Sequence, residues 1–129
     1  IEDAERLIRD TYNSGINVNF NIVIGFPNET ERDFHQTMEF IKRNKSFISF
    51  VSSPGECWIG NQTYLNTHPE EFGVEPMPQG HLWQTKDGKN THRVREERMA
   101  IFNDFVNSLG LPLHNYTALS NRNPGSPVN

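Results

Sequence analysis

The sequence predicts an α/β fold in which parallel strands alternate with helices. The even-numbered residues from 18 to 26 are all apolar, and this period of two is that of a strand. Apolar residues then recur at helical spacing over residues 30–44, and residues 47–53 are again rich in strand-forming types, ended by Pro54 and Gly55. A strand, helix, strand order of this kind favours a right-handed parallel crossover.

The chain begins in an amphipathic helix with acidic residues in its first turn, without a preceding linker. Only 34% of the residues are hydrophobic, and the mean hydropathy is -0.69. We therefore expect the chain to be an excerpt of a longer protein, with a thin core of its own.

The strand at residues 18–26 has one apolar face and one mixed face, which carries Asn19, Asn21, Val23 and Gly25. In a parallel sheet both faces are normally covered, and the strands are continuously apolar. Two asparagines on one face indicate that this face looks into a polar space, as the interior of a ligand-filled barrel would provide.

The helix at residues 31–44 is predicted from its start signal and its apolar stripe. Thr30 and Asp33 form a variant of the capping box, and Phe34, Met38 and Ile41 fall on one face. The first amides of such a helix lack partners within it, so its N-terminus is a candidate site for an anion or a carboxylate.

The segment IVIGFPNET at residues 22–30, followed by RDF and an amphipathic helix, resembles the late barrel strand of radical S-adenosylmethionine enzymes. The fullest similarity is to their cobalamin-dependent branch, and residues 4–16 and 63–74 are also similar to that family. The resemblance implies a fragment of an incomplete TIM-type (β/α) barrel with a C-terminal helical extension. Residues 1–60 would be the C-terminal part of the barrel, residues 61–112 a loop and helical extension, and residues 113–129 a flexible tail.

The resemblance also implies which residues contact the cofactor. The family places a Gly-x-Ile-x-Gly pattern of this strand against the adenine of S-adenosylmethionine. Here valine replaces the isoleucine, and asparagine replaces the first glycine, so an amide side chain stands where the backbone would approach the ligand. Glu29 is expected to cap or orient the turn. The implied cofactor-binding residues are Asn21, Val23, Gly25, Phe26, Pro27 and Glu29.

Enzymes of this family hold a 4Fe-4S iron-sulfur cluster on three cysteines, and this chain has one, Cys57. We therefore expect S-adenosylmethionine, the cluster and cobalamin to belong to the full-length parent, with none bound to this chain alone. Its partner would be the missing N-terminal half of the barrel, and the chain would be inactive without it. Left alone, it is expected to self-associate through uncovered sheet edges or to have a mobile N-terminal region.

Residues 60–90 show no clear pattern and suggest a substrate-selecting loop or lid, with Trp58 and Trp83 packing it onto the domain. We expect Glu56 to be a solvated loop acid, with a substrate contact as the alternative. The five histidines lack the spacing of a metal site. A final helix is predicted from about residue 92 to residue 109, with a Met and Phe stripe in the core.

Charge and composition exclude other classes of function. The net charge of -4 and the pI of about 5.7 argue against nonspecific binding of nucleic acid. No apolar run approaches the roughly 20 residues that span a bilayer. A lone cysteine fits a reducing cytoplasm.

Two other functions remain open on the sequence. The strand and helix around Gly25 are also typical of a phosphate-binding βα unit in another barrel enzyme. Alternatively, the chain is a non-catalytic interaction domain in which residues 60–90 form the binding loop.

Overall fold

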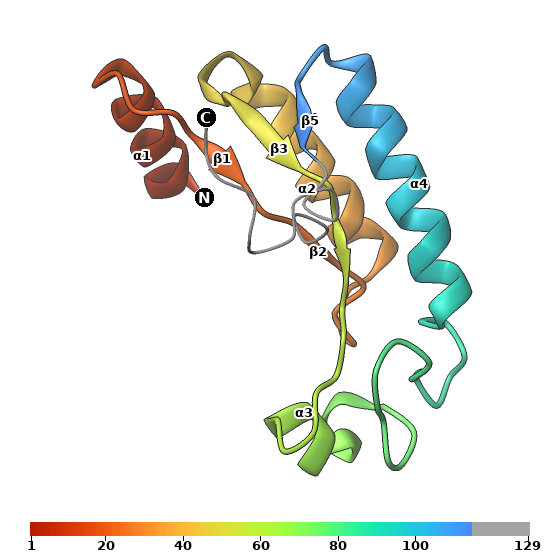
Figure 1. The fold of residues 1–129 in the computed structure, drawn as a ribbon. Coiled ribbons are helices and arrows are strands. Elements are labelled where there is room, and N and C mark those ends of the chain that lie inside the picture. Colours follow the sequence, from red (N-terminus) through yellow and green to blue (C-terminus); the bar gives the residue numbers. More distant parts are fainter. Residues whose placement is uncertain (115–129) are drawn as a thin grey trace, which may run out of the picture.

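The computed structural model describes residues 1–114, which form a mixed α/β structure of short parallel strands and helices (Figure 1). The elements are α1 (Glu2–Asn13), β1 (Asn19–Phe20), β2 (Val23–Ile24), α2 (Glu31–Asn44), η1 (Lys45–Phe47), β3 (Phe50–Ser52), β4 (Gly55–Glu56), α3 (Tyr64–Thr67), η2 (Pro69–Phe72), α4 (His92–Ser108) and β5 (Leu113–His114).

The strands form two small open sheets, one of β1, β3 and β5 in that order, the other of β2 and β4. All three strand pairings are parallel, as the sequence predicted for the first two strands. The predicted single strand at residues 18–26 is divided into β1 and β2. Only residues 50–52 of the predicted strand at residues 47–53 form a strand, β3, and β4 follows after a second break at residues 53 and 54. Pro54 lies at that second break, where a residue without an N–H group interrupts the ladder.

Helix α2 has the predicted bounds and start signal. The Thr30 side chain accepts a hydrogen bond from the Asp33 amide over 3.2 Å, and the Asp33 carboxylate accepts one from the Thr30 amide over 2.9 Å. The predicted capping box is therefore confirmed, with aspartate in the place of the usual glutamate or glutamine. Helix α4 also agrees with its prediction within one residue at its C-terminus.

Helices α2 and α4 cover one face of the strands (Figure 1). The main core lies between these helices and the sheet, and its buried residues are Ile24, Phe34, Met38, Ile41, Ile48, Val51, Phe102 and Val106. On β2, Ile24 points into this core and is 1% exposed, whereas the neighbouring Val23 is 61% exposed. Successive side chains of a strand point to opposite faces, so Val23 points away from the two helices.

Residues 57–85 overlap the patternless loop that was predicted for residues 60–90, and they contain a small core of their own. Cys57, Ile59, Val74 and Trp83 are buried together, and α3 and η2 lie within the segment. The Trp83 indole N–H donates to the Cys57 carbonyl oxygen over 2.7 Å, and antiparallel bridges join Ile59 to Gly80 and Val74 to Thr85. Because these contacts join residues distant in sequence, periodicity could not predict them.

The C-terminal boundary also differs from the expectation. The flexible tail was predicted from residue 113, but Leu113 and His114 form β5, which pairs with β3. Residues 115–129 of the predicted tail lie outside the described residues. Among residues 1–114, none of the helices is both long and apolar enough to span a membrane.

Candidate functional site

The turn after β2 is held in shape by Glu29. Gly25 has φ of +83°, a left-handed conformation that favours glycine. The Gly25 amide donates to Glu29 Oε1 over 3.1 Å, and the Glu29 amide donates back to the Phe26 carbonyl oxygen over 2.8 Å. Glu29 thus orients the turn. The Gly25 N–H group is thus hydrogen-bonded within the protein.

Glycine at position 25 also makes room for helix α4. A Cβ atom on Gly25 would lie 2.3 Å from both Cγ and Cδ of Arg95. The Arg95 side chain is fully buried, and its methylene groups pass directly over the turn. A glycine at position 25 is therefore needed for the Arg95 side chain of α4 to pack over the turn.

Asn90 joins the same turn to the residues that precede α4. Its side-chain amide donates to the Gly25 and Phe26 carbonyl oxygens over 3.1 and 3.2 Å. Its side-chain oxygen accepts from Nη1 of Arg95 over 2.9 Å. Asn90 is 3% exposed, so these polar contacts are shielded from water.

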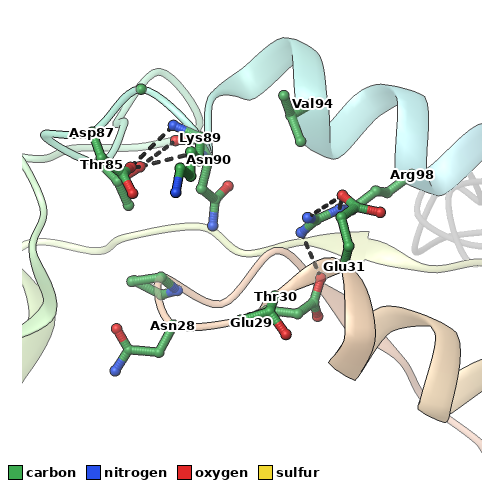
Figure 2. A pocket seen from close by; sticks show the side chains of 12 residues that line it. Asn28, Glu29, Thr30, Glu31, Thr85, Asp87, Lys89, Asn90, Val94 and Arg98 are labelled. Atoms are coloured by element: carbon green, nitrogen blue, oxygen red, sulfur yellow. Dashed lines mark hydrogen bonds and ion pairs between the residues drawn. The ribbon is translucent and has the colours of Figure 1, made fainter.

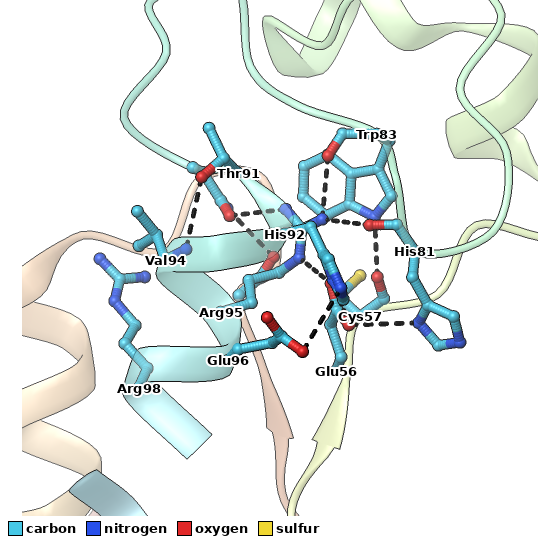
Figure 3. Close-up of polar contacts among 12 residues, drawn as sticks. Glu56, Cys57, His81, Trp83, Thr91, His92, Val94, Arg95, Glu96 and Arg98 are labelled. Atoms are coloured by element: carbon cyan, nitrogen blue, oxygen red, sulfur yellow. Dashed lines mark hydrogen bonds and ion pairs between the residues drawn. The ribbon is translucent and has the colours of Figure 1, made fainter. Parts of the chain in front are cut away.

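A buried ion pair lies next to the turn (Figure 3). Arg95 Nε donates to Glu56 Oε1 over 2.6 Å, with side-chain exposures of 0% and 6%. Arg95 Nη2 donates to the carbonyl oxygens of His81 and Trp83, and the guanidinium carbon lies 3.8 Å from the centre of the Trp83 ring. The expectation that Glu56 is a solvated loop acid was wrong, because Glu56 is the buried counter-ion of Arg95.

Two histidines reach the same carboxylate from the surface. His92 Nδ1 lies 2.8 Å from Glu56 Oε1, and His81 Nδ1 lies 3.3 Å from Glu56 Oε2. The hydrogen bond to Glu56 raises the pKa of His92 above its usual value. His81 and His92 are thus neighbours in space, although the loop between them hides this in the sequence. Among residues 1–114, no group of three or more His, Cys, Asp and Glu is placed to hold a metal ion.

A second arginine of α4 contacts the start of α2 (Figure 2). Arg98 Nη1 lies 3.0 Å from Glu29 Oε1, and Arg98 Nη2 contacts Glu31. Burial raises the pKa of Glu29, since the loss of solvation outweighs the hydrogen bond from Gly25 and the charge of Arg98. An open cleft of about 720 Å³ lies between this turn, residues 85–90 and α4. Three carboxylates and two cations line the cleft: Glu29, Glu31, Asp87, Lys89 and Arg98.

The residues predicted to bind a cofactor occupy different environments. Asn21 and Val23 are exposed on the sheet face that points away from the helices, and Phe26 is 44% exposed. Gly25 and Pro27 are buried, and Glu29 is half-buried. Val23 and Asn21 therefore share one accessible surface, whereas Gly25 and Glu29 shape the turn that ends it.

No family model matches this chain, and no solved structure matches it.

Sequence reasoning missed Asn90, Arg95 and Arg98. The predicted Met and Phe stripe is confirmed in part, because Phe102 is buried and Met99 and Phe105 pack against the main core. The buried face of α4 also runs through Arg95 and Arg98, which were not predicted. Stepping back from Phe102 by one and two helical turns reaches Arg98 and Arg95. Two arginines in the register of a core stripe were the available signal that buried carboxylates would face them.

Proposed function

We propose that this chain is the C-terminal part of a radical S-adenosylmethionine enzyme and supplies one wall of its adenosyl pocket. The observation that carries the proposal is the position of Val23. Its side chain is 61% exposed on the face of parallel strands that α2 and α4 leave uncovered, two residues before the left-handed Gly25.

The arrangement of helices and strands supports this function. In barrel enzymes the helices pack outside the strands, and the ligand lies at the carboxyl ends of the strands. Here β2 and β4 run parallel, and their last residues, Ile24 and Glu56, lie opposite each other. The two strands therefore end side by side, next to the turn at Gly25. An apolar residue close to this end, on the face that α2 and α4 leave uncovered, is well placed to pack against an adenine ring.

The roles of the residues follow from their accessibility. Val23 and Phe26 would provide apolar contacts with adenine, and the Asn21 amide would hydrogen-bond the ribose. Gly25 and Pro27 would shape the pocket rather than donate hydrogen bonds, because the Gly25 N–H and C=O groups are already paired within the protein. Glu29 would act through the turn that it holds.

The iron–sulfur cluster does not fit this chain. Cys57 is its only cysteine, it is 5% exposed, and burial raises the pKa of its thiol. Three thiolates are needed, so they would come from the missing half of the barrel, which is the partner that we propose. The same partner would cover the uncovered sheet face.

The alternative of a phosphate-binding βα unit is disfavoured by charge. The Asp33 amide of α2 is already paired with Thr30, and Arg98 contacts both Glu29 and Glu31. The carboxylates of Glu29 and Glu31 stand beside the helix N-terminus where an anion would have to bind. Saturable binding of inorganic phosphate at this turn would favour the alternative.

Sequencing the gene upstream of this chain is the first test. We expect an open reading frame that encodes a Cys-x-x-x-Cys-x-x-Cys motif before residue 1. The longer protein, loaded with its cluster and given a reductant, should convert S-adenosylmethionine to 5'-deoxyadenosine and methionine. A complete gene product without a three-cysteine site would overturn the proposal.

A further inference from the structure

The Asn90 side chain orients the Gly25–Phe26 turn, and the consequence of this contact for a ligand rests on the proposed function. Both carbonyl oxygens of the turn accept hydrogen bonds from one side-chain amide, that of Asn90. A single planar amide that bridges two successive carbonyls restricts the rotation of the peptide between them. Asn90 is separated from these residues by more than sixty positions in the sequence, so the contact depends on the tertiary fold.

Asn90 is itself held in a fixed orientation. Arg95 Nη1 donates to its Oδ1 atom over 2.9 Å, which leaves the NH₂ group pointing at the turn. Its backbone N–H donates to Thr85 Oγ1 over 3.0 Å, and its carbonyl oxygen accepts from the Thr85 amide over 3.0 Å. Asp87 closes this small loop by accepting from the Thr85 hydroxyl over 2.7 Å.

Arg95 holds the turn from its other side. Its Cγ and Cδ atoms fill the space over the Gly25 Cα atom, while its guanidinium group is anchored by Glu56 and Trp83. Glu56 belongs to the strand that pairs with β2. The turn, strand β4 and the start of α4 are thus joined through one buried side chain.

We propose that Asn90 and Arg95 are positioning residues for the proposed adenosyl site. Arg95 orients the Asn90 amide, and Asn90 sets the direction of the Gly25–Phe26 peptide, and with it the placement of Val23 and Phe26. Neither residue would touch the ligand. Residues 85–95 thereby act on the site from the helix-covered side of the strands, rather than as a lid over its open side.

The variant Asn90→Asp tests this role selectively. Aspartate keeps an oxygen for Arg95 but replaces the donor to both carbonyls with a second acceptor. A matched control is Asn66→Asp, because Asn66 also lies within residues 60–90. Asn66 likewise donates to a carbonyl, that of Pro78 over 2.8 Å, and accepts with its Oδ1 atom from the Gln62 amide over 3.1 Å.

NMR spectroscopy of this chain reads the turn directly. In Asn90→Asp we expect upfield shifts of the Gly25 and Phe26 carbonyl carbons, and exchange of the Gly25 amide proton that is about tenfold faster. Asn66→Asp should leave these signals in place. If Asn90→Asp does not fold, Asn90→Ala removes the same donors without adding a charge. Unchanged Gly25 and Phe26 signals in a folded variant would overturn the proposal.

The longer cluster-containing protein separates this inference from the proposed function. There, Asn90→Asp should raise KM for S-adenosylmethionine about tenfold while kcat changes much less, because the residue places the pocket wall and takes no part in bond cleavage. If the wild type does not bind S-adenosylmethionine but the turn signals still move, the proposed function fails and the positioning contact stands. If the wild type and Asn90→Asp bind S-adenosylmethionine equally, the positioning role fails and the function stands.

Discussion

Arg95 Nε donates to Glu56 Oε1 over 2.6 Å, in a place where the two side chains are 0% and 6% exposed. Removing one partner of such a pair leaves a buried charge without compensation. Glu56→Gln should therefore lower the free energy of unfolding by about 3–5 kcal/mol, measured by urea denaturation.

The matched control for this pair is Glu97→Gln, which breaks the exposed contact between Arg93 and Glu97 on the same helix. Exposed ion pairs contribute about 0.2–1 kcal/mol to stability. The urea concentration at the midpoint of unfolding should therefore be nearly the same for this variant and the wild type. Equal effects of the two substitutions would show that the Glu56 carboxylate is not buried as described.

Gly25 and Gly15 both have a left-handed φ angle but differ in their surroundings. Their φ angles are +83° and +80°, but a Cβ atom on Gly15 would meet nothing within 4 Å. Gly15→Ala should cost about 1–2 kcal/mol from the left-handed conformation alone. Gly25→Ala should cost about 1–3 kcal/mol more, because its Cβ atom overlaps Arg95. Thermal unfolding of both variants checks the difference, and equal melting temperatures would contradict the contact between Gly25 and Arg95.

The histidine at the start of α4 should make stability depend on pH. The hydrogen bond to Glu56 raises the pKa of His92 in the folded protein above the usual 6.5. A raised folded pKa contributes stability that is complete below the unfolded pKa and is lost as the pH rises through the folded pKa. His92→Gln should therefore lower the free energy of unfolding more at about pH 5.5 than at about pH 8.5.

NMR titration of the His92 ring gives an independent check of this prediction. Its midpoint should lie above 6.5, and a midpoint at or below that value would contradict the contact with Glu56.

Burial raises the pKa of Glu29 in the folded protein as well. The stability that this carboxyl group contributes should therefore be complete below its usual pKa of 4.5 and should be lost as the pH rises above that value.

The exposed sheet face should promote self-association of the chain. Strand β1 lies at the edge of its sheet, and Val23 is exposed on the uncovered face. Sedimentation velocity should show association that increases with protein concentration and weakens in Val23→Glu. Ile101→Glu introduces the same charge at a site that is 52% exposed on α4, and it should leave the association unchanged. A monodisperse monomer at high concentration would be the contrary result.

Local signals were sufficient to predict part of the fold. The capping box and apolar stripe of α2 lie within fourteen residues, and apolar residues at helical spacing also mark the second half of α4, so both helices were found with accurate bounds. The parallel arrangement of the first two strands followed from their order along the chain. The break between β1 and β2 was not predicted, because the pattern of residues 18–26 continues through it.

The residues that shape the candidate site were harder to predict because they meet over long distances in sequence. Glu56 and Arg95 are 39 positions apart, and Asn90 and Gly25 are 65 positions apart. An isolated acid after a strand and an arginine in a helix are each typical of solvent-exposed positions. Only the packing of Arg95 against Gly25 and Trp83, and the burial of the Glu56 side chain beside it, identifies them as buried partners.

The affinity for S-adenosylmethionine is the most direct test of whether the adenosyl group lies against Val23. It should be measured on the longer cluster-loaded protein with Val23→Glu and with the control Ile101→Glu. Val23→Glu should raise Kd at least about tenfold, since a carboxylate placed against adenine loses its solvation without gaining a partner. Ile101→Glu should keep the wild-type Kd. Equal affinity of the wild type and both variants would contradict the placement of the adenosyl group against the uncovered sheet face.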